Sequence, residues 1–187
     1  SQGKFTDGNF YKNWAAAKES GIYRGAYHFY DLRSSGGKPE EQADYFAEEL
    51  NGDIGNLPPV LDFESPGVSD YPPLPYHDES VDIVMRFCKR FRKKTKFMPM
   101  IYTNGVGIQC LSPLNSYLKG LDLWIAWYST EYHTPRHYEW PDWRFWQYKC
   151  KGDGPAFGVE STSLDMNVFN GTEENLKDYV TMLGQIR

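Results

Sequence analysis

Two carboxylates stand one residue apart at the end of an apolar stretch of this chain. The segment 57–65 reads LPPVLDFES and carries Asp62 and Glu64. Side chains of a strand alternate between its two faces, so both carboxylates are expected on one face with α-carbons roughly 6.5 Å apart. Acids this close drive their pKa values apart, so one keeps a charge and the other a proton, as cleavage of a glycosidic bond requires. An Asp-x-Glu at a strand end can equally cap a helix or pair with surface lysines.

Composition excludes several classes of protein. The 187 residues fit one domain, 1–187, and the formal net charge of -5 repels phosphate backbones, which argues against nucleic-acid binding. No apolar run approaches the roughly 20 residues that cross a membrane. The three cysteines have no Cys-x-x-Cys spacing, and the histidines at 28, 77, 133 and 137 lack carboxylate or cysteine partners at ligand spacing. We therefore expect neither a metal nor a cofactor.

Hydrophobic periodicity predicts alternating strands and helices through most of the chain. Helices are expected near residues 9–20, 39–50, 78–96, 113–119 and 173–183, and strands near 21–30, 57–64, 98–103, 121–129, 143–150 and 163–171. Only loop separates the last strands. The pattern indicates an α/β protein with a parallel sheet, either doubly wound or closed as a barrel, and in both the ligand lies at the carboxyl ends of the strands.

Polar and aromatic side chains follow the apolar core of five of these strands. They are His28 and Tyr30, Asp62 and Glu64, Tyr102 and Asn104, Tyr128, and Gln147 and Tyr148. This recurrence indicates one site at that end of the sheet. The proline-rich segment 65–77, directly after the carboxylates, is either a wall of the site or a stiff connector. The basic run 89–94 is interpreted as a solvated helix face and is assigned no function.

Seven motifs in order resemble the Chalaropsis-type muramidases, the lysozymes of glycoside hydrolase family 25. They are SQGKFTDGNFYKNWAAAKESG, GAYHFY, LPPVLDFE, PMIYTNG, LWIAWY, FWQY and LDMNVFNG, which together span nearly the whole chain. The resemblance implies an irregular, TIM-like β/α barrel whose late strands lack helices. It also implies cleavage of the β-1,4 bond between N-acetylmuramic acid and N-acetylglucosamine in peptidoglycan, whose glycan strand would be the partner.

The resemblance assigns roles to particular residues. Glu64 matches the family's general acid/base, Asp62 its partner carboxylate, and Asp165 a further acid of the active site. The nucleophile is left open between Asp62, a water and the substrate's own 2-acetamido group, with substrate assistance preferred. Candidates for substrate contacts are Tyr27, His28, Tyr102, Tyr128, Trp146 and Tyr148, and the alternative for each of these side chains is a place in the core.

One part of the family pattern is absent from this sequence. The family begins with a strand bearing an Asp-x-Ser motif, whose aspartate joins the active-site acids, and no such motif precedes the first match at Ser1. The expectation is a barrel without its first strand and most of its second. An upstream segment or a second chain would then complete it, unless the barrel stays open with reduced activity.

Three functions follow from these observations. The first is a muramidase that lyses cell walls, acting outside the cell as a secreted enzyme or delivered to the wall by a phage as an endolysin. The second is a catalytically impaired module that binds peptidoglycan or another glycan. The third is a hydrolase acting on chitin. Turnover of purified cell walls and of chitin oligomers separates the three.

Overall fold

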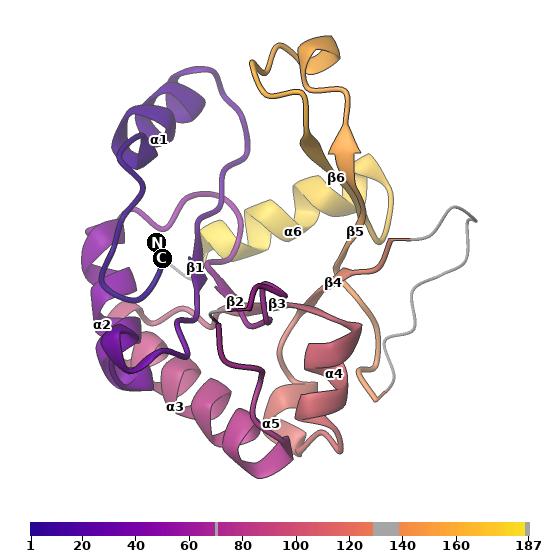
Figure 1. Ribbon diagram of the computed structural model, residues 1–187. Coiled ribbons are helices and arrows are strands. Elements are labelled where there is room, and N and C mark those ends of the chain that lie inside the picture. The colour runs from indigo at the N-terminus through magenta and orange to yellow at the C-terminus, as the bar shows by residue number, and fades with distance from the viewer. Residues whose placement is uncertain (70, 129–138, 186–187) are drawn as a thin grey trace.

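The computed structural model describes residues 1–69, 71–128 and 139–185 (Figure 1). Six strands form one mixed sheet in the order β1-β2-β3-β4-β5-β6, which makes a half-barrel covered by helices. Strands β1 to β5 run parallel, and β6 is antiparallel to β5. Their bounds are β1 Tyr27–Phe29, β2 Val60–Asp62, β3 Met100–Asn104, β4 Leu123–Ala126, β5 Phe145–Gly152 and β6 Leu164–Phe169.

The helices lie close to the predicted positions, with one addition. They are α1 Phe10–Glu19, α2 Pro39–Leu50, α3 His77–Thr95, α4 Gly105–Leu111, α5 Ser116–Lys119 and α6 Glu173–Gln185. Helix α1 ends before Gly21, whose φ of +69° provides the left-handed residue expected there. Helix α4 was not predicted. The last helix continues through Gly184, which was expected just past its end.

The outer face of the sheet packs against α2 and α3, which lie together on one side of the molecule (Figure 1). Leu61, Phe63 and Ile101 are fully buried there. The two helices are joined by Phe46 stacked on Phe91, with ring centroids 5.1 Å apart. Arg86 and Arg90 of α3 also reach Glu40 and Asp44 of α2 in bidentate ion pairs.

The opposite, concave face of the sheet has a smaller apolar core. Val60, Met100, Tyr102 and Ala126 are buried on it together with Tyr179 of α6. The Tyr179 hydroxyl donates to Oδ2 of Asp122, which directly precedes β4, over 2.7 Å. Helix α6 therefore covers the amino ends of the strands and leaves their carboxyl ends free of it.

The early strands are shorter than the sequence pattern predicted. Only Tyr27–Phe29 of the expected strand at 21–30 forms a strand; before it, the Arg24 carbonyl accepts from the amides of Asn56 and Leu57. Strand β2 ends at Asp62, so Glu64 lies just beyond it. At the free edge of β1 the first residue pairs with the strand: the Ser1 ammonium donates to the Tyr27 carbonyl and the Ser1 carbonyl accepts from the Phe29 amide.

Candidate active site

Asp62 is the last residue of β2 and faces the concave side of the sheet, where it is 9% exposed. Its Oδ1 atom is buried and accepts no hydrogen bond from the residues that the structure describes. The pKa of Asp62 lies well above its ordinary value, because burial penalises the charged form and the nearby charge of Glu64 adds to that penalty. A buried carboxyl oxygen without a partner has unused capacity to bind a polar ligand group.

Glu64 is half-buried two residues further on. Its Oε2 accepts a hydrogen bond of 2.9 Å from Nδ2 of Asn104. Burial raises the pKa of Glu64, the bond from Asn104 opposes this rise, and the charge of Asp165 adds to it. A carboxyl group that holds its proton toward neutral pH is suited to act as a general acid.

Asn104 gives Glu64 a fixed partner. It ends β3, and the pairing of Asp62 with Tyr102 places residue 104 beside residue 64. The Oδ1 atom of Asn104 caps α4 by accepting from the amides of Val106 and Gly107 at 3.0 and 3.1 Å. Since these bonds fix the orientation of the amide, its Nδ2 is directed at Glu64. Asn104 was predicted at a strand end but without a role in the site; an Asn before a helical turn is the signal that identifies it.

Asp165 approaches the same region from β6, where its side chain is exposed. Its negative charge contributes to the raised pKa values of Glu64, Tyr27 and Tyr128. The three acidic residues, far apart along the chain, therefore lie within electrostatic range in one region of the concave face.

Three of the predicted aromatic residues lie on this side of the sheet. The hydroxyls of Tyr102 and Tyr128 both donate to Oε1 of Gln147, at 2.9 and 2.6 Å. Tyr102 is buried, whereas Tyr128 and Tyr27 are each 56% exposed. Gln147 was also not among the predicted site residues. It pairs with Ala126 and so faces the concave side, whereas Trp146 pairs with Ile125 and faces the helices.

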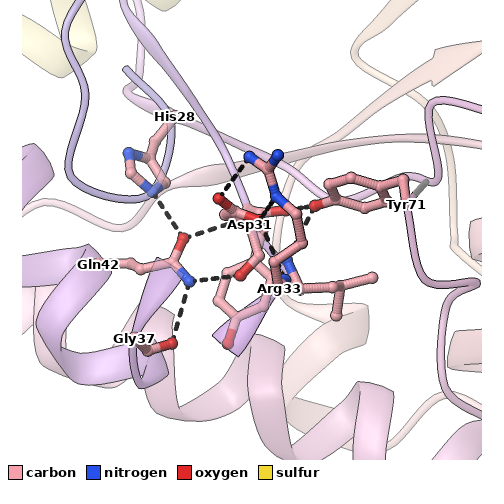
Figure 2. Close-up of polar contacts among 8 residues, drawn as sticks. His28, Asp31, Arg33, Gly37, Gln42 and Tyr71 are labelled. Carbon is pink, nitrogen blue, oxygen red and sulfur yellow. Dashed lines mark hydrogen bonds and ion pairs between the residues drawn. The ribbon is translucent and has the colours of Figure 1, made fainter. Parts of the chain in front are cut away.

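His28 lies on the opposite face, which corrects its assignment as a substrate contact. It is fully buried between Phe46 of α2 and Phe87 of α3, and its Nε2 bonds Oε1 of Gln42 at 3.1 Å (Figure 2). Burial lowers the pKa of His28 to about 4, so the ring is neutral at neutral pH. The reason is strand alternation: His28 pairs with Leu61, and Asp62 pairs with Phe29.

Trp146 and Tyr148 are half-buried, and their role as substrate contacts stays a prediction. The Trp146 indole nitrogen donates to the carbonyl of Trp127 over 2.7 Å, and its ring packs edge-on against Trp143. Tyr148 in turn packs against Trp146, with ring centroids 6.0 Å apart. The Trp146 ring packs against the larger core on the helix side of β5, whereas Tyr148 lies where the pairing of β5 with β6 shifts register, between Gln147 and Lys149.

The loops around the carboxyl ends of the strands are held by a buried network (Figure 2). Gln42 accepts from the Asp31 amide at 2.9 Å and donates to the carbonyls of Asp31 and Gly37. Tyr71, within the proline-rich segment, donates to the Tyr30 carbonyl at 2.7 Å. The charge of Asp62 contributes to the raised pKa of Tyr71. The proline-rich segment is thus fastened close to the acids.

Within the described parts of the chain, no group of three or more His, Cys, Asp or Glu side chains is arranged to hold a metal ion. Cys88, Cys110 and Cys150 are free thiols. Among the helices of the described residues, none has the length and apolar character needed to cross a membrane.

Comparisons with known proteins agree on one family. The model of glycosyl hydrolases family 25 matches residues 1–156. The uncharacterised protein YegX of Escherichia coli O157:H7 is 32% identical over 95% of this chain and 59% of its own length. Lysozyme M1 of Streptomyces globisporus is 32% identical over 92% of this chain and 58% of its own. This chain thus spans less than two thirds of these relatives.

A solved structure has a similar fold. The muramidase from Acremonium alcalophilum superposes with a TM-score of 0.74 at 27% identity, over 97% of this chain and 84% of its own. The family model covers Asp62, Glu64 and Asn104, so sequence and fold lead to one conclusion. The chain belongs to glycosyl hydrolases family 25.

Proposed function

We propose that this chain hydrolyses the β-1,4 bond between N-acetylmuramic acid and N-acetylglucosamine in peptidoglycan. The observation that carries the proposal is the pair at the end of β2: a half-buried Glu64 with a raised pKa, held by Asn104, beside Asp62 with a buried, unpartnered oxygen. The matched relatives include a lysozyme and a muramidase, which supports this substrate. Such an enzyme acts at the cell wall, outside the cytoplasm.

The roles of the acids follow from their environments. Glu64 donates its proton to the glycosidic oxygen as the bond from that oxygen to C1 breaks. The carbonyl oxygen of the substrate's 2-acetamido group bonds to C1 in its place, and the unpartnered oxygen of Asp62 accepts the hydrogen bond of the acetamido N–H. A water then gives its proton to Glu64 and attacks C1, which restores the acetamide. The charge of Asp165 stabilises the positive charge that develops on the sugar.

The aromatic residues complete the proposed cleft. Tyr27 and Tyr128 are exposed on the side of the acids and are proposed to contact the glycan, with Tyr102 beneath them fixing Gln147. Rings with a polar edge suit the apolar faces and hydroxyls of sugars.

We also propose that residues 1–187 form the larger part of one irregular β/α barrel. A further strand beside β1, from an upstream segment or a second chain, would close the half-barrel. Two features support this. In the described residues β1 ends the sheet and has only the bridge from Gln2 on its other side, and a cavity of about 220 Å³ on the concave face is lined by apolar residues of several strands, among them Val60, Met100 and Phe145. Edge strands and apolar faces of this kind are ordinarily covered.

The function is tested by the release of reducing ends from purified peptidoglycan. Glu64→Gln keeps the size of the side chain but cannot exchange a proton, so turnover should fall by at least about a hundredfold. Glu174→Gln, at an exposed carboxylate of α6, is the matched control and should retain activity. Binding of peptidoglycan without cleavage would instead identify a binding module. Cleavage of chitin oligomers but not of peptidoglycan would identify a different substrate.

A further inference from the structure

Helix α3 carries its positive charges on two flanks with different surroundings. On the flank toward α2, Arg86, Arg90 and Lys94 are all within ion-pair distance of carboxylates of α2 or of Asp82. On the other flank, four exposed cations have no carboxylate within ion-pair distance among the residues that the structure describes. They are Lys89, Arg92, Lys93 and, directly after the helix, Lys96, called here the α3 basic cluster.

The spacing of the cluster places its members on one face. Positions i, i+3, i+4 and i+7 lie along a single stripe of a helix. This stripe borders a hollow of about 460 Å³ lined by the four cations and by Tyr117 of α5. The Lys89 ammonium lies 5.4 Å from the centre of the Tyr117 ring. The nearby carboxylate of Asp122 is taken by Arg144 and Tyr179 and leaves the cluster unneutralised.

Solvation and the helix dipole explain this arrangement only in part. Cations in the last turn of a helix are stabilised by the dipole, which accounts for Arg92 and Lys93. Lys89 lies further from the helix end, and like charges at these spacings repel one another. The charge also opposes the balance of the chain, whose formal net charge is -5. The α3 basic cluster is therefore a local concentration of cations around one concave surface, without ion-pair partners in the part of the chain that the structure describes.

The chemistry of the hollow selects its ligand. Lysine and arginine side chains only donate hydrogen bonds, so a matching ligand must be anionic and rich in acceptors. A phosphate group offers several anionic oxygens on one centre and can meet two or more of the four cations at once. A neutral sugar would leave these donors without charged partners. The overall negative charge and the presence of one half-buried ring in the lining disfavour a nucleic acid.

We propose that the α3 basic cluster binds phosphate groups of an anionic cell-wall polymer. This rests on the proposed function, because it supposes that the chain works at a cell wall. Helix α3 runs from the carboxyl ends of the strands, near the acids, to the amino end of β3, where Lys96 lies. The cluster is thus set apart from Asp62 and Glu64, and a phosphate polymer held there leaves the proposed cleft free for the glycan.

Binding of a synthetic poly(glycerol phosphate) to the whole chain, followed by fluorescence anisotropy at several salt concentrations, tests the proposal. Replacing all four cluster residues with glutamine should weaken binding at least about tenfold and flatten its dependence on salt, because fewer counterions are exchanged. The matched control carries glutamine at Lys12, Lys38, Lys149 and Lys151, which are exposed and lie outside the cluster. It changes the net charge equally and should lose less than about threefold.

Several outcomes would overturn the proposal. Equal losses in the two variants would reduce the effect to net charge. Equal affinity for poly-L-glutamate would remove the preference for phosphate, and tighter binding of a single-stranded DNA would replace the polymer with a nucleic acid.

Thermal unfolding checks that the variants fold, and the double variant Lys89→Gln/Lys93→Gln should weaken binding partially. Hydrolysis of phosphate-free peptidoglycan is measured separately: its failure in the unmodified chain counts against the proposed function, whatever the polymer result.

Discussion

Asn104 joins two tasks in one amide group, capping α4 through its oxygen and holding Glu64 through its nitrogen. Asn104→Asp keeps an oxygen for the cap but replaces the donor with a carboxylate beside Glu64. Since like charges favour the protonated form, the pKa of Glu64 should rise. The alkaline limb of kcat/KM, which requires the protonated acid, should move to higher pH. Titration of the Glu64 carboxyl carbon by NMR follows the same change without relying on activity.

Asn104→Ser separates the two tasks further. A serine retains the capping oxygen but cannot reach Glu64 and adds no charge, so the pKa of Glu64 should rise less than in Asn104→Asp. Asn104→Ala loses both tasks and should also lose about 1 kcal/mol of stability from the cap. If the pKa of Glu64 in all three variants equalled its value in the unmodified chain, Asn104 would act only as a helix cap.

At the scale of elements, the sequence pattern located most strands and helices but not which way each side chain faces. Apolar stripes and Gly21 predicted α1 to within a residue or two, and alternating strands with helices predicted the parallel sheet. His28 and Asp62 follow similar apolar stretches and are equivalent in the sequence. Only the register, His28 with Leu61 and Phe29 with Asp62, sends them to opposite faces. Register depends on contacts between distant segments, which periodicity along one segment does not contain.

The same limit applies to residues that act through others. Gln147 and Asn104 were both noticed at strand ends, but their roles depend on partners more than 18 residues away in the chain, Tyr128 among them. Gln42 is buried in α2 among residues predicted to form an ordinary amphipathic helix, and nothing in that pattern marks it as the partner of His28.

Gln42 connects α2 to the loop after β1, and its removal should be costly. Gln42→Ala would leave the Asp31 amide and two carbonyls without their buried partner. Each unsatisfied buried group costs about 1–3 kcal/mol, so the free energy of unfolding should fall by about 3 kcal/mol or more. Urea denaturation measures the loss. Gln109→Ala, at an exposed position of α4, is the matched control and should change stability by less than about 0.5 kcal/mol.

For the whole molecule, the buried ionisable groups of the two faces respond to pH in opposite ways. The pKa of His28 is lowered to about 4 in the folded chain. Because the unfolded histidine takes up a proton below its ordinary pKa of about 6.5, His28 should destabilise the fold as the pH falls from about 6.5 to 4. The pKa of Asp62 is raised, so its contribution has the opposite sign and weakens the fold as the pH rises above about 3.9, the value for an unfolded aspartate.

The loss of folding stability caused by the buried carboxyl of Asp62 can be measured. Asp62→Asn removes a buried group whose charged form is penalised, so the variant should be more stable than the unmodified chain at pH 7, with Tm higher by about 2–4 °C for each kcal/mol gained. The gain should vanish below about pH 4, where the aspartate is protonated in both states. The same substitution should lower hydrolysis of peptidoglycan by about a hundredfold, because the acetamido N–H loses its carboxyl acceptor and meets a carboxamide that can also present an N–H. We expect higher stability together with lost turnover, because the buried carboxyl destabilises the fold and is needed for the reaction. A variant less stable at pH 7 would show that Asp62 holds the half-barrel together, and its buried oxygen would then have to be satisfied within the fold.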